Sequence, residues 1–148
     1  MMLICAFVGM LLAEQTVSSY SYLFISLTGI ALCAASAAAI NQVVDREVDA
    51  SMTRTDQRPL PKGDLSVMHA SIFAFVIGLL GALILYLYVN TLTMILTIGS
   101  LIGYAFIYTV YLKRATPQNI VIGGLAGAAP PLLGWSSVSN TIDPFALL

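Results

Sequence analysis

Long apolar runs, separated by short polar breaks, make up most of this chain. A membrane-spanning helix needs about 20 apolar residues, at about 1.5 Å each, to cross roughly 30 Å of hydrocarbon. Runs of about that length predict spans at residues 20–44, 67–88, 92–112 and 119–135. The run at residues 1–13 is too short, so we expect the second half of a first span there, and residues 144–148 should begin a sixth. The pattern predicts an all-α, polytopic transmembrane helix bundle.

The polar break at residues 50–66 contains two prolines and a glycine. Pro59 and Pro61 are expected to prevent a regular helix, because proline restricts the backbone and lacks an N–H. Gly63 should then allow a tight turn.

Two further features concern the last predicted span. Pro130 and Pro131 lie inside it and should bend or break the helix. Residues 136–143 follow as an expected polar loop.

Composition agrees with a membrane location. Of 148 residues, 59% are apolar and 9% are charged, and the mean hydropathy is +0.92, far from the balance of a soluble domain. The net charge of −1 falls in a few short segments, so no nucleic-acid-binding surface is indicated. Cys5 and Cys33 lie inside apolar runs without a CxxC spacing, which indicates small apolar side chains.

The basic residues give the orientation of the chain in the membrane. Every Lys and Arg falls either between Arg46 and Lys62 or in the pair Lys113-Arg114. Because two predicted spans separate these segments, both should lie on the same side. By the positive-inside rule that side is cytoplasmic.

The end of the span at residues 20–44 contains a regularly spaced polar group. If residues 36–49 are helical, Asn41, Asp45 and Asp49 stand at i, i+4 and i+8, each about 40° around the helix from the last. All three would share one face. Asn41 lies deeper in the span than a topology signal requires, and polar residues within a membrane usually have a function.

These residues are suited to a metal-bound diphosphate. Carboxylates are hard ligands for Mg²⁺, which often takes one or two of them together with substrate phosphates. Arg54, Arg58 and Lys62 follow in the same loop, and basic side chains bind phosphate oxygens. The alternative is a solvated loop whose charges only fix topology.

The pattern NxxxDxxxDxxMxRTxxRPLPxG, from Asn41 to Gly63, resembles the first aspartate-rich motif of the UbiA-type membrane prenyltransferases. Residues 108–114 and 116–131 extend the similarity, more narrowly, to the members of that family that act on protohaem IX. The resemblance covers essentially the whole chain.

The resemblance implies nine transmembrane helices around a central cavity, about five of them present here. Residues 1–148 are then a partial domain, truncated at both ends, in which the family's second aspartate motif is absent. We therefore expect these 148 residues alone to be inactive.

The resemblance also implies roles for individual residues. Asp45 and Asp49 would bind Mg²⁺ on an isoprenyl diphosphate, and Asn41 would contact the diphosphate or a metal-bound water. The implied diphosphate-binding residues are basic: Arg54, Arg58, Lys62 and Lys113. The implied reaction transfers a farnesyl group from farnesyl diphosphate to a vinyl group of haem B, within haem A biosynthesis for haem–copper oxidases.

The implied partners are farnesyl diphosphate, haem B and the lipid bilayer, with haem A synthase or oxidase assembly factors as possible protein contacts. The implied location is the bacterial plasma membrane, or the mitochondrial inner membrane in a eukaryote.

Three rival functions deserve comparison. A related prenyltransferase acting on an aromatic quinone precursor fits the RTxxRPLP loop less well. A transporter or channel fragment would place further polar residues at mid-span, and the spans at residues 67–88 and 92–112 contain none that are charged. A CDP-alcohol transferase needs a DG…AR pattern, whereas Arg46 and Glu47 follow Asp45.

Overall fold

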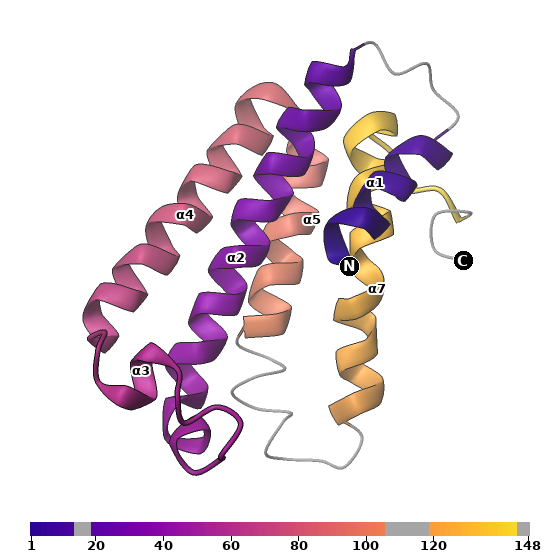
Figure 1. The fold of residues 1–148 in the computed structure, drawn as a ribbon. Coiled ribbons are helices and arrows are strands. Elements are labelled where there is room, and N and C mark those ends of the chain that lie inside the picture. The colour runs from indigo at the N-terminus through magenta and orange to yellow at the C-terminus, as the bar shows by residue number, and fades with distance from the viewer. Residues whose placement is uncertain (14–18, 106–118, 145–148) are drawn as a thin grey trace.

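The computed structural model describes residues 1–13, 19–105 and 119–144. In this part of the chain the fold is all-helical (Figure 1), and six helices are described: α1 (Met2–Leu12), α2 (Tyr20–Ala50), α3 (Pro59–Lys62), α4 (Val67–Tyr88), α5 (Thr91–Ile102) and α7 (Asn119–Ser139). The predicted all-α fold is confirmed. Of the described helices, α2 and α4 are long and apolar enough to cross a membrane; the other predicted spans stay predictions.

Polar side chains define where the helices begin. The Ser19 hydroxyl accepts the Ser21 N–H at 3.2 Å, and the Ser66 hydroxyl accepts the His69 N–H at 3.3 Å. Asn90 Oδ1 accepts the Thr93 N–H at 2.7 Å. Each satisfies a backbone donor that has no partner within its helix.

The most extensive helix contact lies between α2 and α4, which are side by side in Figure 1. Gly29 and Gly81 allow this close approach: a Cβ on Gly81 would lie 2.8 Å from the Gly29 oxygen and 2.8 Å from Cys33 Sγ. The Ser36 hydroxyl donates to the Ala74 carbonyl across the contact at 2.7 Å. Small residues pack helices closely in lipid, where little hydrophobic drive exists between them.

A second pair, α1 and α7, lies beside the first, and α5 contacts both pairs. At the end of the bundle away from α3, polar groups join the pairs. The Tyr22 hydroxyl donates to the Ser137 carbonyl at 2.7 Å, and Asn90 Nδ2 donates to the Ser136 carbonyl at 3.0 Å. The Thr93 and Ser136 hydroxyls lie 3.0 Å apart. This network fixes α2, α5 and α7 relative to one another.

Two expectations about prolines were wrong. Pro59 and Pro61 do not prevent a helix: α3 begins at Pro59, because its fixed φ suits the first helical position and its missing N–H has no partner there anyway. The backbone of α7 also continues through Pro130 and Pro131 without a break. Gly63 does end α3 in the left-handed conformation, with φ of +82°.

The expected loop at residues 136–143 begins later than predicted. Helix α7 continues to Ser139, and Ser136 and Ser137 are fully buried. Their hydroxyls donate to the Leu133 and Gly134 carbonyls at 3.1 and 2.7 Å, so each serine satisfies its own polar group inside the helix.

Candidate functional site

Helix α2 is longer than a membrane requires. Its 31 residues span about 46 Å, whereas the hydrocarbon core is roughly 30 Å thick. Helix α4, with 22 residues, spans about 33 Å and matches that thickness. The extra turns of α2 therefore extend past the end of α4, next to α3 (Figure 1), and they contain Asp45 and Asp49.

The two aspartates are buried although they lie near the end of the helix. Asp45 is 5% exposed and Asp49 is 6% exposed. Glu47, between them, has a side chain that is 83% exposed. The helical spacing expected from the sequence therefore holds, with both aspartates on an inner face and Glu47 on an outer one. Asn41 belongs to the same face and is half-buried.

The loop after α2 folds back onto Asp49. Arg58 Nη1 donates to Asp49 Oδ2 at 2.6 Å. The Thr55 hydroxyl donates to the Asp49 carbonyl at 2.9 Å, and Thr55 is only 3% exposed. Burying a carboxylate is costly unless it is paired and hydrogen-bonded, so Arg58 compensates the burial of Asp49.

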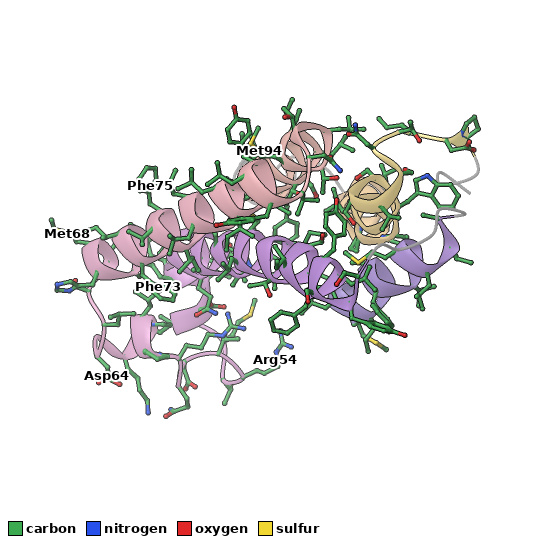
Figure 2. All side chains as sticks on the ribbon, turned by 90° about the horizontal axis from the view of Figure 1, so that it is seen from above. Arg54, Asp64, Met68, Phe73, Phe75 and Met94 are labelled. Carbon is green, nitrogen blue, oxygen red and sulfur yellow. The ribbon has the colours of Figure 1, made fainter. Side chains whose placement is uncertain are left out.

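The other basic residues of the loop remain accessible. Arg54 and Lys62 are both exposed, and Lys62 ends α3. Figure 2 shows Arg54 and Asp64 on opposite sides of the segment that includes α3. The expected site is thus partly assembled: Arg58 touches Asp49, while Arg54 and Lys62 face solvent at the same end of the bundle. Lys113 lies outside the described residues.

Sequence reasoning assigned no role to Thr55 or Asp56. Thr55 attaches the loop to α2, and the signal was its place directly after Arg54 in the motif. Asp56 is half-buried, and its Oδ1 is buried without a hydrogen-bond partner in the described part of the chain. Its backbone N–H donates to the Met52 carbonyl at 2.9 Å, which turns the side chain back toward the loop.

The donor set suits a Mg²⁺–diphosphate complex better than a metal held by protein alone. Residues 1–13, 19–105 and 119–144 contain no group of three or more His, Cys, Asp or Glu side chains gathered closely enough to hold a metal. Mg²⁺ commonly uses one or two carboxylates and takes its remaining ligands from phosphates and water. Asp45 and Asp49 fit that requirement.

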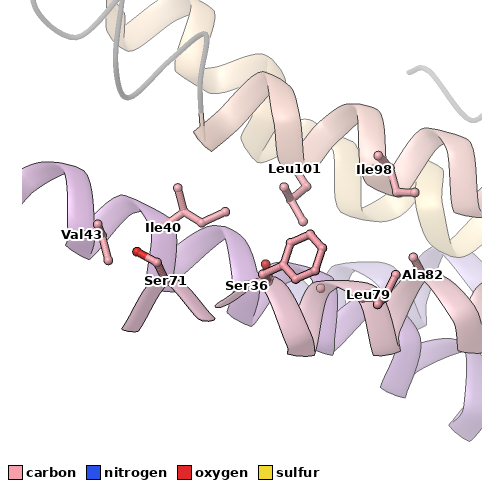
Figure 3. Close-up of a pocket in the computed structure, with 10 residues that line it drawn as sticks. Ser36, Ile40, Val43, Ser71, Leu79, Ala82, Ile98 and Leu101 are labelled. Atoms are coloured by element: carbon pink, nitrogen blue, oxygen red, sulfur yellow. The ribbon is translucent and has the colours of Figure 1, made fainter. Parts of the chain in front are cut away.

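Three cavities adjoin α2 in the described structure. One, of about 240 Å³, lies between α1, α2, α5 and α7, and we call it the inner cavity. A groove of about 430 Å³ lies between α2, α4 and α5, where Figure 3 shows Leu101 near Ser36. A third, of about 630 Å³, lies between α2, α3 and α4. In Figure 2, Phe75 and Phe73 point to opposite sides of α4, toward the second and third of these.

The inner cavity is aligned with the aspartates. Ala34 and Ala38 line it from α2, and they stand on the helix face that also contains Asn41 and Asp45, at spacings of three and four residues. Ala38 is only about 4.5 Å along the helix axis from Asn41. The polar face at the end of α2 therefore continues into an apolar interior.

This architecture is that of an integral membrane protein with buried carboxylates beside basic residues at one end of a helical bundle. The sequence profile of the UbiA prenyltransferase family matches residues 2–148, and the chain belongs to that family.

Individual relatives are similar over the whole chain. It is 60% identical over 148 residues to "Protoheme IX farnesyltransferase 2" of Pseudoalteromonas atlantica, covering 100% of this chain and 48% of the relative. It is 57% identical over 148 residues to "Protoheme IX farnesyltransferase" of Idiomarina loihiensis, covering 100% and 50%. The chain spans about half the length of these curated relatives. No solved structure matches it.

Proposed function

We propose that the protein containing this chain transfers a farnesyl group from farnesyl diphosphate to a vinyl group of protohaem IX (haem B), giving haem O. The observation that supports this most directly is the similarity of all 148 residues to protohaem IX farnesyltransferases at 57–60% identity. The relatives' name supplies both substrates, and the chemistry of the site is compatible with them.

Asp45 and Asp49 would bind Mg²⁺ on the diphosphate, with Asn41 beside them. When bound, the metal supplies positive charge that stabilises the leaving diphosphate. The chain's own contribution is orientation, because both carboxylates project from a rigid helix and are shielded from bulk water.

Arg58 would act as a bridge. One of its nitrogens already donates to Asp49, and the guanidinium group has five N–H donors. Its side chain is 41% exposed, so further donors remain accessible to phosphate oxygens. Arg54, Lys62 and Lys113 would add donors from the same membrane face.

The inner cavity would receive the isoprenoid. Ionisation of the allylic C–O bond leaves a carbocation that bulk water would capture, so an apolar environment protects it. Ile30, Ala34 and Ala37 provide such a wall on α2. The transfer would occur at the cytoplasmic face, where the positive-inside rule places the charged loop.

The test uses the protein at its full encoded length in membranes, supplied with haem B, farnesyl diphosphate and Mg²⁺, with haem O detected by mass spectrometry. Asp45→Asn and Asp49→Asn should each lower the rate by about 100-fold or more, the usual consequence of removing a transition-state charge contact. Glu47→Gln is the matched control, because Glu47 lies on the same helix but faces outward; it should retain activity.

Two results would contradict the proposal. One is transfer to an aromatic quinone precursor with no reaction on haem. The other is equal loss of activity in all three variants, since a site on the inner face predicts a clear difference between the aspartates and Glu47.

A further inference from the structure

The inner cavity has two chemically different walls. The wall on α2 is made of Ile30, Cys33 and three alanines. The wall on α5 contains Thr97, Ser100 and Tyr104, which are spaced at i, i+3 and i+7 and therefore share one helix face. We call these three residues the hydroxyl face. An isoprenoid chain needs no hydroxyl groups, so this face indicates a polar occupant.

Thr97 is the most informative of the three. It is 3% exposed, and its Oγ1 is buried with no hydrogen-bond partner among the described residues. A buried hydroxyl without a partner costs about 1–3 kcal/mol. By contrast Thr93, one turn earlier on α5, is equally buried and has its hydroxyl 3.0 Å from that of Ser136. Thr97 alone of this pair is left for a ligand.

Water is the occupant that the cavity can accommodate. A buried water typically makes two to four hydrogen bonds, and apolar cavities stay dry. The hydroxyl face offers up to three polar contacts, and about 240 Å³ is several times the roughly 30 Å³ that one water fills. Helix α5 runs in the same direction as α2 in Figure 1, so the Tyr104 end of this face lies toward the aspartates.

We propose that the hydroxyl face binds ordered water inside the inner cavity, and that Thr97 is a positioning residue for the water that completes the reaction. The proposal rests on the proposed function. Thr97 has one donor and two acceptor sites, so it can hold a water oxygen in place while the α2 wall keeps the rest of the cavity apolar.

The chemical step balances as follows. The C1–O bond of farnesyl diphosphate breaks and the electron pair leaves with the diphosphate. The terminal vinyl carbon bonds to farnesyl C1, which moves the positive charge to the vinyl carbon attached to the porphyrin ring. The oxygen of the bound water bonds to that carbon, and one water proton is released to the diphosphate. Without the water, the cation loses a proton from the adjacent carbon and becomes an alkene.

The first experiment measures this partition between products in the full-length protein. Thr97→Val keeps the shape of the side chain and removes the hydroxyl. The ratio of dehydrated to hydroxylated farnesyl-haem should rise about tenfold, as expected for the loss of one hydrogen bond. Thr97→Ser should restore the normal ratio. A merely structural role would lower both products together, so an unchanged ratio in Thr97→Val would overturn the proposal.

The second experiment tests for water without requiring activity. Cys5 and Cys33 are first replaced by alanine, and Thr97→Cys or Thr93→Cys is then added. A small hydrophilic methanethiosulfonate should label Cys at position 97 at least about tenfold faster than at position 93, because the reagent needs a hydrated thiol. Equal labelling would overturn the proposal. If the unchanged protein makes no farnesyl-haem but position 97 is labelled faster, the proposed function fails and the hydrated face stands.

Discussion

At the scale of single residues, Asp49 is where the loop and the helix meet. Its carboxylate accepts from Arg58 and its carbonyl accepts from Thr55. These residues follow it by nine and six positions, so the spacing within the motif corresponds to a loop that closes back onto the end of α2. A site residue and its supports are thus encoded in one short segment.

Arg58→Ala should destabilise the protein by about 1–2 kcal/mol, the range for a charge-assisted hydrogen bond whose donor is partly exposed. The reason is that Asp49 stays buried after its partner is lost. Arg58→Lys should lie in between, because lysine keeps the charge but not the planar fork. Thermal unfolding in detergent measures the effect, and trypsin cleavage after Arg54 should become faster as the loop loosens.

Arg46→Ala is the control for that change. Arg46 pairs with Glu47 at 3.7 Å, and both side chains are well exposed. Exposed pairs contribute at most about 1 kcal/mol and often nothing. If Arg58→Ala and Arg46→Ala shift the unfolding temperature equally, Arg58 does not stabilise the buried carboxylate.

At the scale of helices, the sequence predicted the long apolar elements well. The bounds expected for residues 67–88 agree with α4, and the helical continuation beyond residue 44 that puts Asp45 and Asp49 on one face is observed. Hydrophobic length determines such elements almost alone. Helix α3 and the end of α7 were missed, because proline at a first turn and serine bonded to its own helix both look like breaks in a sequence.

The contacts of the site could be predicted less well than its residues. Spacing placed the aspartates on one face, but it gave no sign that Arg58 would pair with Asp49 or that Thr55 would be buried. These depend on the backbone path of residues 50–58, which has no regular period. The inner cavity likewise depends on which helices pack together, and in an apolar chain that choice is made by small residues whose partners are far away in sequence.

The α2–α4 contact supplies a prediction at this scale. Gly81→Ala should destabilise the protein by about 1–3 kcal/mol, because its Cβ would meet the Gly29 oxygen and Cys33 Sγ in a close-packed contact. Gly99→Ala is the matched control, since nothing lies within 4 Å of its Cβ position. That change should be neutral or stabilise by up to about 1 kcal/mol, as alanine is the better helix former.

The two glycine variants are best compared by thermal unfolding in the same detergent. A destabilisation of about 1 kcal/mol corresponds to roughly 2–4 °C for a chain of this size. If Gly81→Ala unfolds no earlier than Gly99→Ala, close packing between α2 and α4 does not contribute to stability.

At the scale of the whole molecule, the described helices form two pairs, α2–α4 and α1–α7, which α5 connects. Large apolar side chains such as Phe24, Phe75 and Leu87 are exposed on the outside, as lipid-facing residues are. The polar groups lie inside or at the ends, where they find partners. The inner cavity lies between the two pairs, so its shape depends on how the pairs are held together and not on any single helix.

This arrangement leads to the last prediction, that a polypeptide of residues 1–148 alone does not farnesylate haem. In the part that the structure describes, Asp45 and Asp49 are not joined by a third carboxylate, histidine or cysteine in one metal-binding group. Two carboxylates leave much of the charge of a metal-bound diphosphate to be neutralised by other groups. Membranes containing only residues 1–148 should therefore give no haem O, as judged by mass spectrometry. Co-expression with the portion of the Idiomarina loihiensis relative that this chain does not match is the control for folding. Restored activity would show that the missing groups are supplied in trans, whereas transfer by residues 1–148 alone would show that Asp45, Asp49 and the basic loop suffice.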